Sequence, residues 1–124
     1  MIFIIGGSYQ GKRDYALENY HLTESDVFTC TEETREIDLG KTVIEHIERF
    51  ALGCVRRSEE PQVYWDRLNL ADKILIADDV SCGVVPMDAV LRAWREASGR
   101  ANNALAARAD HVIRVFCGLG QVIK

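Results

Sequence analysis

Residues 2–16 read IFIIGGSYQGKRDYA, and this stretch decides the fold. It opens with the apolar run 2–5, passes through a glycine-rich turn and takes on a helical pattern from Gly11. A short buried strand that leads through glycines into a helix is typical of an α/β protein with a parallel sheet. The turn also has the spacing of a phosphate-binding loop, with Gly6, four intervening residues, Gly11 and Lys12.

The physics of such a loop explains why these residue types matter. Glycines let successive backbone N–H groups point inward, where they form a positive nest for phosphate oxygens. The next helix adds its N-terminal dipole, and the lysine reaches the outer phosphates. We therefore predict that a nucleotide is bound by Gly6, Gly7, Ser8, Tyr9, Gln10, Gly11, Lys12 and Arg13. The sequence leaves open a simpler alternative, a glycine turn that only joins a strand to a helix.

Arg13 departs from the usual pattern of this loop. It stands where a magnesium-dependent phosphoryl-transfer enzyme normally has a serine or threonine hydroxyl. A guanidinium group cannot coordinate a metal, but it can bind a phosphate as a bidentate donor. We therefore expect nucleotide binding to survive at this loop and metal-dependent catalysis to be weaker.

Two carboxylates follow another predicted strand. Residues 73–77, KILIA, form a short apolar run, and Asp78 and Asp79 come directly after it. In an open α/β sheet, ligands bind at the carboxyl ends of the strands. Asp78 and Asp79 are therefore candidate ligands for Mg²⁺, directly or through water. The alternative is that one of the two aspartates caps a turn and the other is solvated, and for Asp79 the two readings have equal weight.

The rest of the chain alternates between strand and helix patterns. Further strands are predicted at residues 26–30, 111–116 and 121–124, and helices at 11–20, 39–55, 62–68 and in a long segment that Pro86 and Asp88 open. This alternation predicts a mainly parallel sheet with helices on both faces, a three-layer arrangement, and an antiparallel strand at the C-terminus. We expect residues 1–124 to form a single domain.

Composition narrows the class of protein. The 124 residues are 48% hydrophobic and 27% charged, with a formal net charge of −4, which is ordinary for a soluble globular protein. An acidic chain without a Lys/Arg cluster is a poor candidate for binding nucleic acid. The apolar run at the start of the sequence is too short for a signal peptide or a membrane span. Widely spaced cysteines favour free thiols, so we expect a cytoplasmic protein that binds neither nucleic acid nor membrane.

The second half of the chain carries more particular motifs. Residues 78–86 read DDVSCGVVP, residues 92–100 read RAWREASGR, and residues 101–110 read ANNALAARAD. Together with the glycine loop, this order of motifs resembles the adenosylcobinamide kinase / adenosylcobinamide-phosphate guanylyltransferase family. That family carries an N-E-V-G-x-G-I-V-P block, an R-x-F-R-x-x-x-G-R-x-N-x-x-L-A block and an A-D-x-V strand start. The resemblance covers residues 1–20 and roughly 70–124.

The resemblance implies a fold, two reactions and their partners. The fold is a P-loop-type sheet, and the assembly is a homo-oligomer, often a trimer. One reaction phosphorylates the aminopropanol hydroxyl of adenosylcobinamide with ATP or GTP, and the other transfers GMP from GTP to that phosphate through a guanylylated histidine. A nucleoside triphosphate, Mg²⁺ and an adenosylcobinamide-type corrinoid are therefore the implied cofactors and partners.

The same resemblance assigns site residues. Lys12 would stabilise charge on the β- and γ-phosphates, Asp79 falls on the family's Glu as a catalytic candidate, and Asp78 falls on its Asn. The candidate substrate-binding residues are Gly83, Val84, Val85, Pro86 and Arg100. An exposed salt bridge is the alternative for Arg100.

A third catalytic candidate is His46. The family's guanylylated histidine lies in an R-I-x-x-H-R-x-x-R-P stretch that is not found here. His46, on the predicted helix 39–55, is a partial match, and a surface position is its alternative reading. Because of this difference and Arg13, a second hypothesis stays open. It describes a relative that binds nucleotide or corrinoid without turnover, as a regulatory or assembly subunit.

Three aromatic residues and one glycine have open roles. Trp94 is in register with apolar residues of its helix, which favours core packing over ligand stacking. Tyr64 and Trp65 could form a partly exposed pair that meets a flat ligand or another subunit, or they could pack locally onto the sheet. Gly99 costs ~1 kcal/mol relative to Ala inside a helix, which indicates close packing or a bend.

Overall fold

A computed structural model gives the fold for residues 1–81 and 87–124. Four of the candidate substrate-binding residues, Gly83, Val84, Val85 and Pro86, lie outside these described residues. No helix in the described part of the chain is both long enough and apolar enough to span a membrane.

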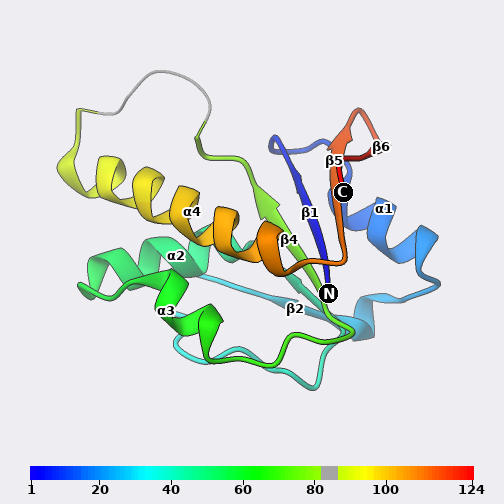
Figure 1. The fold of residues 1–124 in the computed structure, drawn as a ribbon, viewed down its shortest axis with the longest axis horizontal. Helices are drawn as coiled ribbons and strands as arrows, with labels where there is room; N and C mark the ends of the chain where they lie inside the picture. The colour runs from blue at the N-terminus through cyan, green and yellow to red at the C-terminus, as the bar shows by residue number, and fades with distance from the viewer. Residues whose placement is uncertain (82–86) are drawn as a thin grey trace.

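One sheet organises the described residues (Figure 1). Its strand order is β2-β3-β4-β1-β5-β6. The strands are β1 (Ile2–Gly6), β2 (Val27–Thr29), β3 (Val43–Glu45), β4 (Ile74–Asp78), β5 (His111–Phe116) and β6 (Leu119–Val122). All neighbours pair in parallel except β5 and β6, which are antiparallel. The predicted mainly parallel sheet with an antiparallel C-terminal strand is therefore confirmed.

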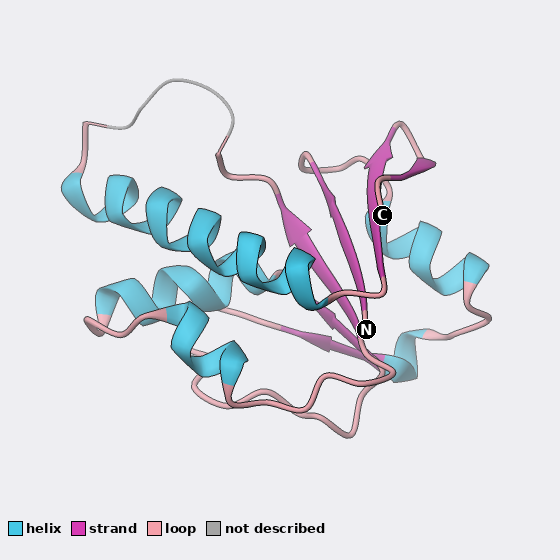
Figure 2. Cartoon of the chain, in the orientation of Figure 1, coloured by secondary structure: helices cyan, strands magenta, loops and turns pink. Residues whose placement is uncertain are grey.

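Helices cover both faces of the sheet, as Figure 2 shows. They are α1 (Lys12–Asn19), α2 (Ile47–Arg56), α3 (Pro61–Asp66) and α4 (Ala89–Arg108), with a short 3₁₀ turn at Glu24–Asp26. The alternation of side chains along β1 separates the two cores, because neighbouring residues point to opposite faces. Phe3 belongs to the cluster beneath α2, α3 and α4, whereas Ile4 belongs to the cluster that contains Ala16 of α1. The three-layer α/β arrangement of the P-loop type is thus confirmed.

One predicted element is wrong in its first half. The helix expected at 39–55 begins only at Ile47, and Val43–Glu45 is strand β3. The pairing explains the error: Val43 and Ile44 are fully buried between β2 and β4, where β-branched side chains pack well. Their spacing from the apolar residues of α2 imitates a longer helix. The other predicted strands and helices are present, with ends that differ by a few residues.

The aromatic residues are part of the protein's own packing. Trp65 is 1% exposed, so of the two alternatives offered for it the partly exposed position is wrong. Its ring centroid lies 5.3 Å from that of Phe50 and 5.7 Å from that of Tyr64. Trp94 is half-buried, and its indole N–H donates to the Glu48 carbonyl at 2.7 Å, which ties α4 to α2. Local packing therefore accounts for Tyr64 and Trp65.

Gly99 lies inside the uninterrupted helix α4. A Cβ atom added at this position would meet no atom of the described residues within 4 Å. Close packing, one of the two explanations offered for Gly99, is therefore wrong, and the bend stays a prediction.

Candidate functional site

The glycine loop joins β1 to α1 and is fixed by backbone geometry. A Cβ at Gly6 would lie 2.3 Å from the Val115 carbonyl oxygen, so only glycine fits there. Gly11 has φ 87°, in the left-handed region that favours glycine. The backbone and side-chain oxygens of Gln10 accept hydrogen bonds at 2.8 Å from the N–H groups of Gly118 and Cys117. The loop is thereby anchored to the turn between β5 and β6.

Lys12 is the central charged group of the loop. Its side chain is 6% exposed, and its ammonium nitrogen lies 2.6 Å from the Gly7 carbonyl oxygen and 2.7 Å from Asp78 Oδ1. Ser8 Oγ donates to the other oxygen of Asp78 at 2.9 Å. Burial acts to raise the pKa of Asp78, but the hydrogen bonds from Lys12 and Ser8 outweigh it, so this pKa lies below its usual value. The loop therefore holds its lysine at the carboxyl edge of β4, beside an ionised carboxylate.

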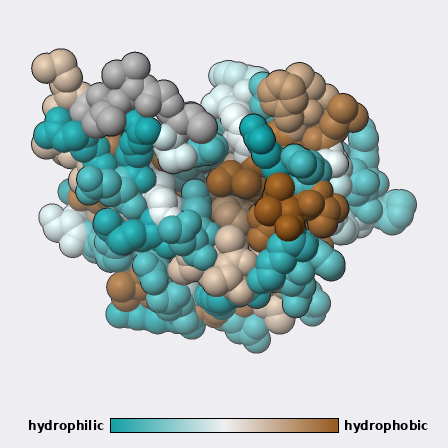
Figure 3. All heavy atoms as spheres, turned by 45° about the horizontal axis from the view of Figure 1, so that its top comes forward, coloured by the Kyte–Doolittle hydropathy of each residue, from teal (hydrophilic) through white to brown (hydrophobic). Residues whose placement is uncertain are grey.

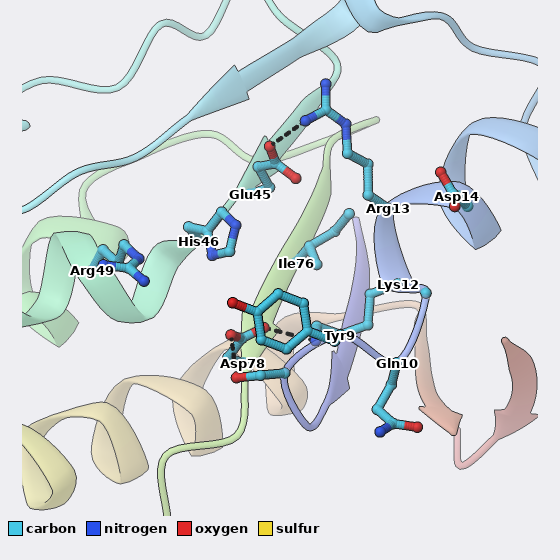
Figure 4. Close-up of a pocket in the computed structure, with 12 residues that line it drawn as sticks. Tyr9, Gln10, Lys12, Arg13, Asp14, Glu45, His46, Arg49, Ile76 and Asp78 are labelled. Atoms are coloured by element: carbon cyan, nitrogen blue, oxygen red, sulfur yellow. Dashed lines mark hydrogen bonds and ion pairs between the residues drawn. The ribbon is translucent and has the colours of Figure 1, made fainter. Parts of the chain in front are cut away.

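A cavity of about 460 Å³ opens beside this lysine (Figure 4). It lies where β1, β3 and β4 end, the edge at which open α/β sheets bind ligands. Its lining combines several cationic side chains with three carboxylates. The lining residues are Ser8, Tyr9, Gln10, Gly11, Lys12, Arg13, Asp14, Glu45, His46, Arg49, Ile76 and Asp78. Six of the eight predicted nucleotide-binding residues, residues 8–13, therefore line one cavity, and Gly6 and Gly7 precede them in the loop.

His46 lies in this cavity, but not on a helix as predicted. It joins β3 to α2 with φ 57°, and its side chain is 37% exposed. Its Nδ1 is 3.2 Å from Glu48 Oε1. The ring lines the same cavity as Lys12, but the side chain is exposed enough that the surface alternative for His46 stays open beside the catalytic one.

The two aspartates of the predicted metal site have different surroundings. Asp78 lines the cavity, whereas Asp79 Oδ1 accepts hydrogen bonds from the backbone N–H and hydroxyl of Ser81, as a turn cap does. Among the described residues, the one group of three potential metal-binding side chains is His46, Glu48 and Asp78, whose donor atoms lie within 4.8 Å of one another. This group includes an imidazole, a ligand that suits zinc or other transition metals better than Mg²⁺.

Glu48 is the buried member of that group. Its side chain is 5% exposed, and its Oε1 accepts the backbone N–H of Asp78 at 3.0 Å. Burial raises the pKa of Glu48, which the hydrogen bond from Asp78 partly offsets. The start of α2 is thereby joined to the end of β4, next to two residues of the cavity lining, His46 and Asp78.

Arg13 points across the cavity toward β3 (Figure 4). Its Nη1 lies 2.9 Å from Glu45 Oε1, and its Nη2 contacts Glu24. Glu45 is 5% exposed, and the same Oε1 accepts a hydrogen bond from Thr29 Oγ1 at 2.7 Å. The residue that replaces the usual hydroxyl is therefore paired with a buried carboxylate.

Arg100 lies outside the cavity lining. It forms two hydrogen bonds with Glu60, at 3.2 and 3.0 Å, on an exposed surface between α4 and the start of α3. This is the exposed salt bridge that the sequence offered as its alternative. A role for Arg100 in substrate binding stays a prediction.

Besides Asp14 and Ile76, the sequence did not predict two charged residues of the cavity, Glu45 and Arg49. Both were assigned to the middle of a helix, so nothing marked them as neighbours of the glycine loop. The missed signal is the local pattern of an apolar run closed by a carboxylate: Val43 and Ile44 precede Glu45 as Ile76 and Ala77 precede Asp78. Arg49 is exposed at the cavity and gave no signal of its own.

Fold and site together define a three-layer α/β protein of the P-loop type, with a lysine-bearing loop beside a cavity at the strand ends. The family model for cobinamide kinase / cobinamide phosphate guanyltransferase, CobU, matches residues 60–123, and the chain belongs to this family. The resemblance found in the motifs is therefore confirmed. The matched residues include α3, β4, α4, β5 and β6, whereas the glycine loop lies outside them.

Two curated relatives carry the same family name. The bifunctional adenosylcobalamin biosynthesis protein CobU of Salmonella typhimurium is 41% identical to this chain over 54 residues. The protein of that name from Escherichia coli is 39% identical over 54 residues. Each match covers 44% of this chain and 30% of the relative. The chain thus matches about a third of the length of each relative.

Proposed function

We propose that this chain is a nucleotide-dependent transferase of cobalamin biosynthesis or salvage that phosphorylates adenosylcobinamide in the cavity beside Lys12. The observation that carries this proposal is the position of the Lys12 ammonium group. It is buried at the carboxyl edge of the sheet, between the Gly7 carbonyl and Asp78. A lysine held there, at the end of a glycine loop and the start of a helix, meets the requirements for binding a polyphosphate.

In this proposal, catalysis is mostly positioning and charge neutralisation. The N–H groups of the loop and of the first turn of α1 bind the phosphates, and Lys12 exchanges Asp78 for β- and γ-phosphate oxygens. The ionised Asp78 then accepts a hydrogen bond from the attacking hydroxyl and orients it toward the γ-phosphorus. We assign this role to Asp78 instead of Asp79, because Asp78 lines the cavity.

The guanylyl-transfer step needs a nucleophile, and His46 is the candidate within the described cavity. In such a step a ring nitrogen attacks the α-phosphorus of GTP, pyrophosphate leaves, and GMP passes from the imidazole to the phosphate of the acceptor. Glu48, 3.2 Å from Nδ1, would orient the ring and stabilise its cationic form. Mass spectrometry of the chain after incubation with GTP would detect the added GMP.

The corrinoid substrate and a homo-oligomeric assembly are also part of this proposal. The corrinoid would enter from the open side of the cavity. The exposed apolar side chains of the C-terminal hairpin support a homo-oligomer, such as the trimer that the family resemblance implies (Figure 3). These side chains are Phe116, Leu119, Val122 and Ile123. Sedimentation equilibrium measures the size of the assembly.

A second function is favoured by one observation, the Arg13–Glu45 ion pair at the position of the usual hydroxyl. It fits a relative that binds nucleotide or corrinoid without turnover. The two functions predict different outcomes when the chain is incubated with ATP or GTP and adenosylcobinamide. A kinase forms adenosylcobinamide phosphate, whereas a non-catalytic relative binds the nucleotide and forms no product.

The matched variants for this assay are Lys12→Ala and Lys41→Ala. Lys41 lies outside the cavity lining and donates to the Ser25 carbonyl. Loss of Lys12 should lower kcat/KM by at least about 100-fold, since a preorganised cation at the transferred phosphate is removed. Lys41→Ala should retain the activity. Equal activity in all three proteins would contradict the proposed role of Lys12.

A further inference from the structure

We propose that Arg13 takes the place of the divalent metal in the nucleotide site, with Glu45 as its positioning residue, so that the triphosphate binds without Mg²⁺. This inference rests on the proposed nucleotide site and deepens it by naming the cation that accompanies the phosphates. It concerns binding, and it assigns a separate task to each of the two terminal nitrogens of the guanidinium group, Nη1 and Nη2.

The first task is anchoring, and Nη1 performs it. This nitrogen lies 2.9 Å from Glu45 Oε1, which also accepts the hydroxyl hydrogen bond of Thr29. Glu45 is 5% exposed, so its carboxylate is fixed by the sheet at the end of β3. Glu45 is the buried member of this pair, and removing its guanidinium partner is costly, because a buried carboxylate is then left without a partner. Nη1 should therefore stay on Glu45 when a ligand binds.

The second task is phosphate binding, and Nη2 is suited to it. This nitrogen contacts Glu24, whose side chain is 72% exposed. Exposed ion pairs are weak, because water screens them and both side chains lose freedom. A phosphate oxygen in the cavity can therefore replace Glu24 on Nη2 at little cost. The guanidinium group then links the buried carboxylate to the phosphate, as a metal ion does in related loops.

The residues present do not fit Mg²⁺ in its usual position. Mg²⁺ demands oxygen ligands in near-ideal octahedral geometry, and position 13 offers a guanidinium instead of a hydroxyl. The carboxylates at the ends of β3 and β4 are both paired already, Glu45 with Arg13 and Asp78 with Lys12. A divalent cation placed between these pairs would be repelled by both positive groups.

The group of His46, Glu48 and Asp78 does not restore a magnesium site. It shares Asp78 with Lys12, and Glu48 Oε1 already accepts the N–H of Asp78. Its imidazole ligand favours zinc, copper, iron or nickel. A chelator that removes all divalent cations therefore tests whether nucleotide binding needs any of these metals.

The experiment measures the affinity of the chain for ATP and GTP by calorimetry, in excess EDTA and in excess Mg²⁺. It compares the wild type with Arg13→Ser, which restores the usual hydroxyl, with Arg13→Gln, which removes the charge but retains length, and with Arg35→Ser. Arg35 is exposed and lies outside the cavity lining. Circular dichroism checks that each variant is folded.

We expect the wild type and Arg35→Ser to bind equally well, within about threefold, in EDTA and in Mg²⁺. Arg13→Ser and Arg13→Gln should lose at least about tenfold in EDTA, because a charge-assisted hydrogen bond is removed. Mg²⁺ should restore binding in Arg13→Ser and not in Arg13→Gln.

A wild type that binds only in Mg²⁺ would overturn this inference and leave the proposed function standing. This result is obtained with the wild type alone. The inference can therefore be contradicted even if the Arg13 variants do not fold. Absence of nucleotide binding by the wild type in both buffers would overturn the proposed function together with the inference.

Discussion

At the scale of single residues, the site depends on positions where only one residue type fits. Gly6 is such a position, because the Val115 carbonyl oxygen of β5 occupies the space of any side chain. Lys12 is another, because its buried ammonium group is matched by two oxygen atoms at 2.6 and 2.7 Å. Both residues were predicted from the sequence, since the pattern of glycines and lysine in a loop is local.

Two glycines give a matched test of this picture. Gly6→Ala would force a Cβ to 2.3 Å from the Val115 oxygen, so we expect it to lower the free energy of unfolding by about 1–3 kcal/mol. Gly99→Ala adds a Cβ in open space inside helix α4, so it should raise the same free energy by roughly 0.5–1 kcal/mol. Urea denaturation measures both changes. Equal effects of the two substitutions would contradict the packing at β1 and β5.

The sequence offered His46 as a candidate only through the family resemblance, and it did not predict that Glu45 and Arg49 lie beside the glycine loop. Glu45, His46 and Arg49 meet the glycine loop only because β3 pairs with β4 and β4 pairs with β1. No local pattern reports that pairing. The sequence predicted the lysine and its loop, and it missed the carboxylate that holds Arg13.

At the scale of elements, the strands explain both the correct secondary-structure predictions and the main incorrect one. The runs at β1 and β4 are apolar and bounded by turn signals, so their assignment required no tertiary information. β3 is only three residues long and is followed closely by α2, so its two apolar residues merged into the helical pattern. The buried environment between β2 and β4, which the sequence alone does not display, decides its conformation.

The packing of α2 against the sheet predicts a pattern of thiol reactivity. Burial, together with the nearby carboxylates of Glu48 and Glu45, raises the pKa of Cys30 to about 12. Burial raises the pKa of Cys54 to about 11, although Arg57 acts in the opposite direction. Cys117 is exposed in the turn between β5 and β6.

Since the thiolate is the reactive form, thiols with raised pKa values stay protonated and unreactive at pH 8. In a Cys82→Ser background, a disulfide reagent at pH 8 should therefore label Cys117 at once. Cys30 and Cys54 should react only after denaturant is added. Peptide mapping by mass spectrometry assigns the labels, and rapid labelling of Cys30 in the native protein would contradict the described core.

At the scale of the whole molecule, the three layers leave a charged cavity at one edge of the sheet and an apolar surface at another. The carboxyl ends of β1, β3 and β4 surround the cavity, where charges of both signs are gathered. The C-terminal hairpin instead presents apolar side chains to the surface (Figure 3). The family match covers the hairpin, β4 and α4, so the proposed nucleotide site joins a matched strand to an unmatched loop.

The central claim is that the glycine loop and Lys12 bind a nucleoside triphosphate. Calorimetric titration of GTP and ATP into the wild type and Lys12→Ala tests it most directly. We predict saturable binding of at least one nucleotide to the wild type, weakened by about tenfold or more in Lys12→Ala. Absence of binding to the wild type, or the same affinity in both proteins, would contradict the claim.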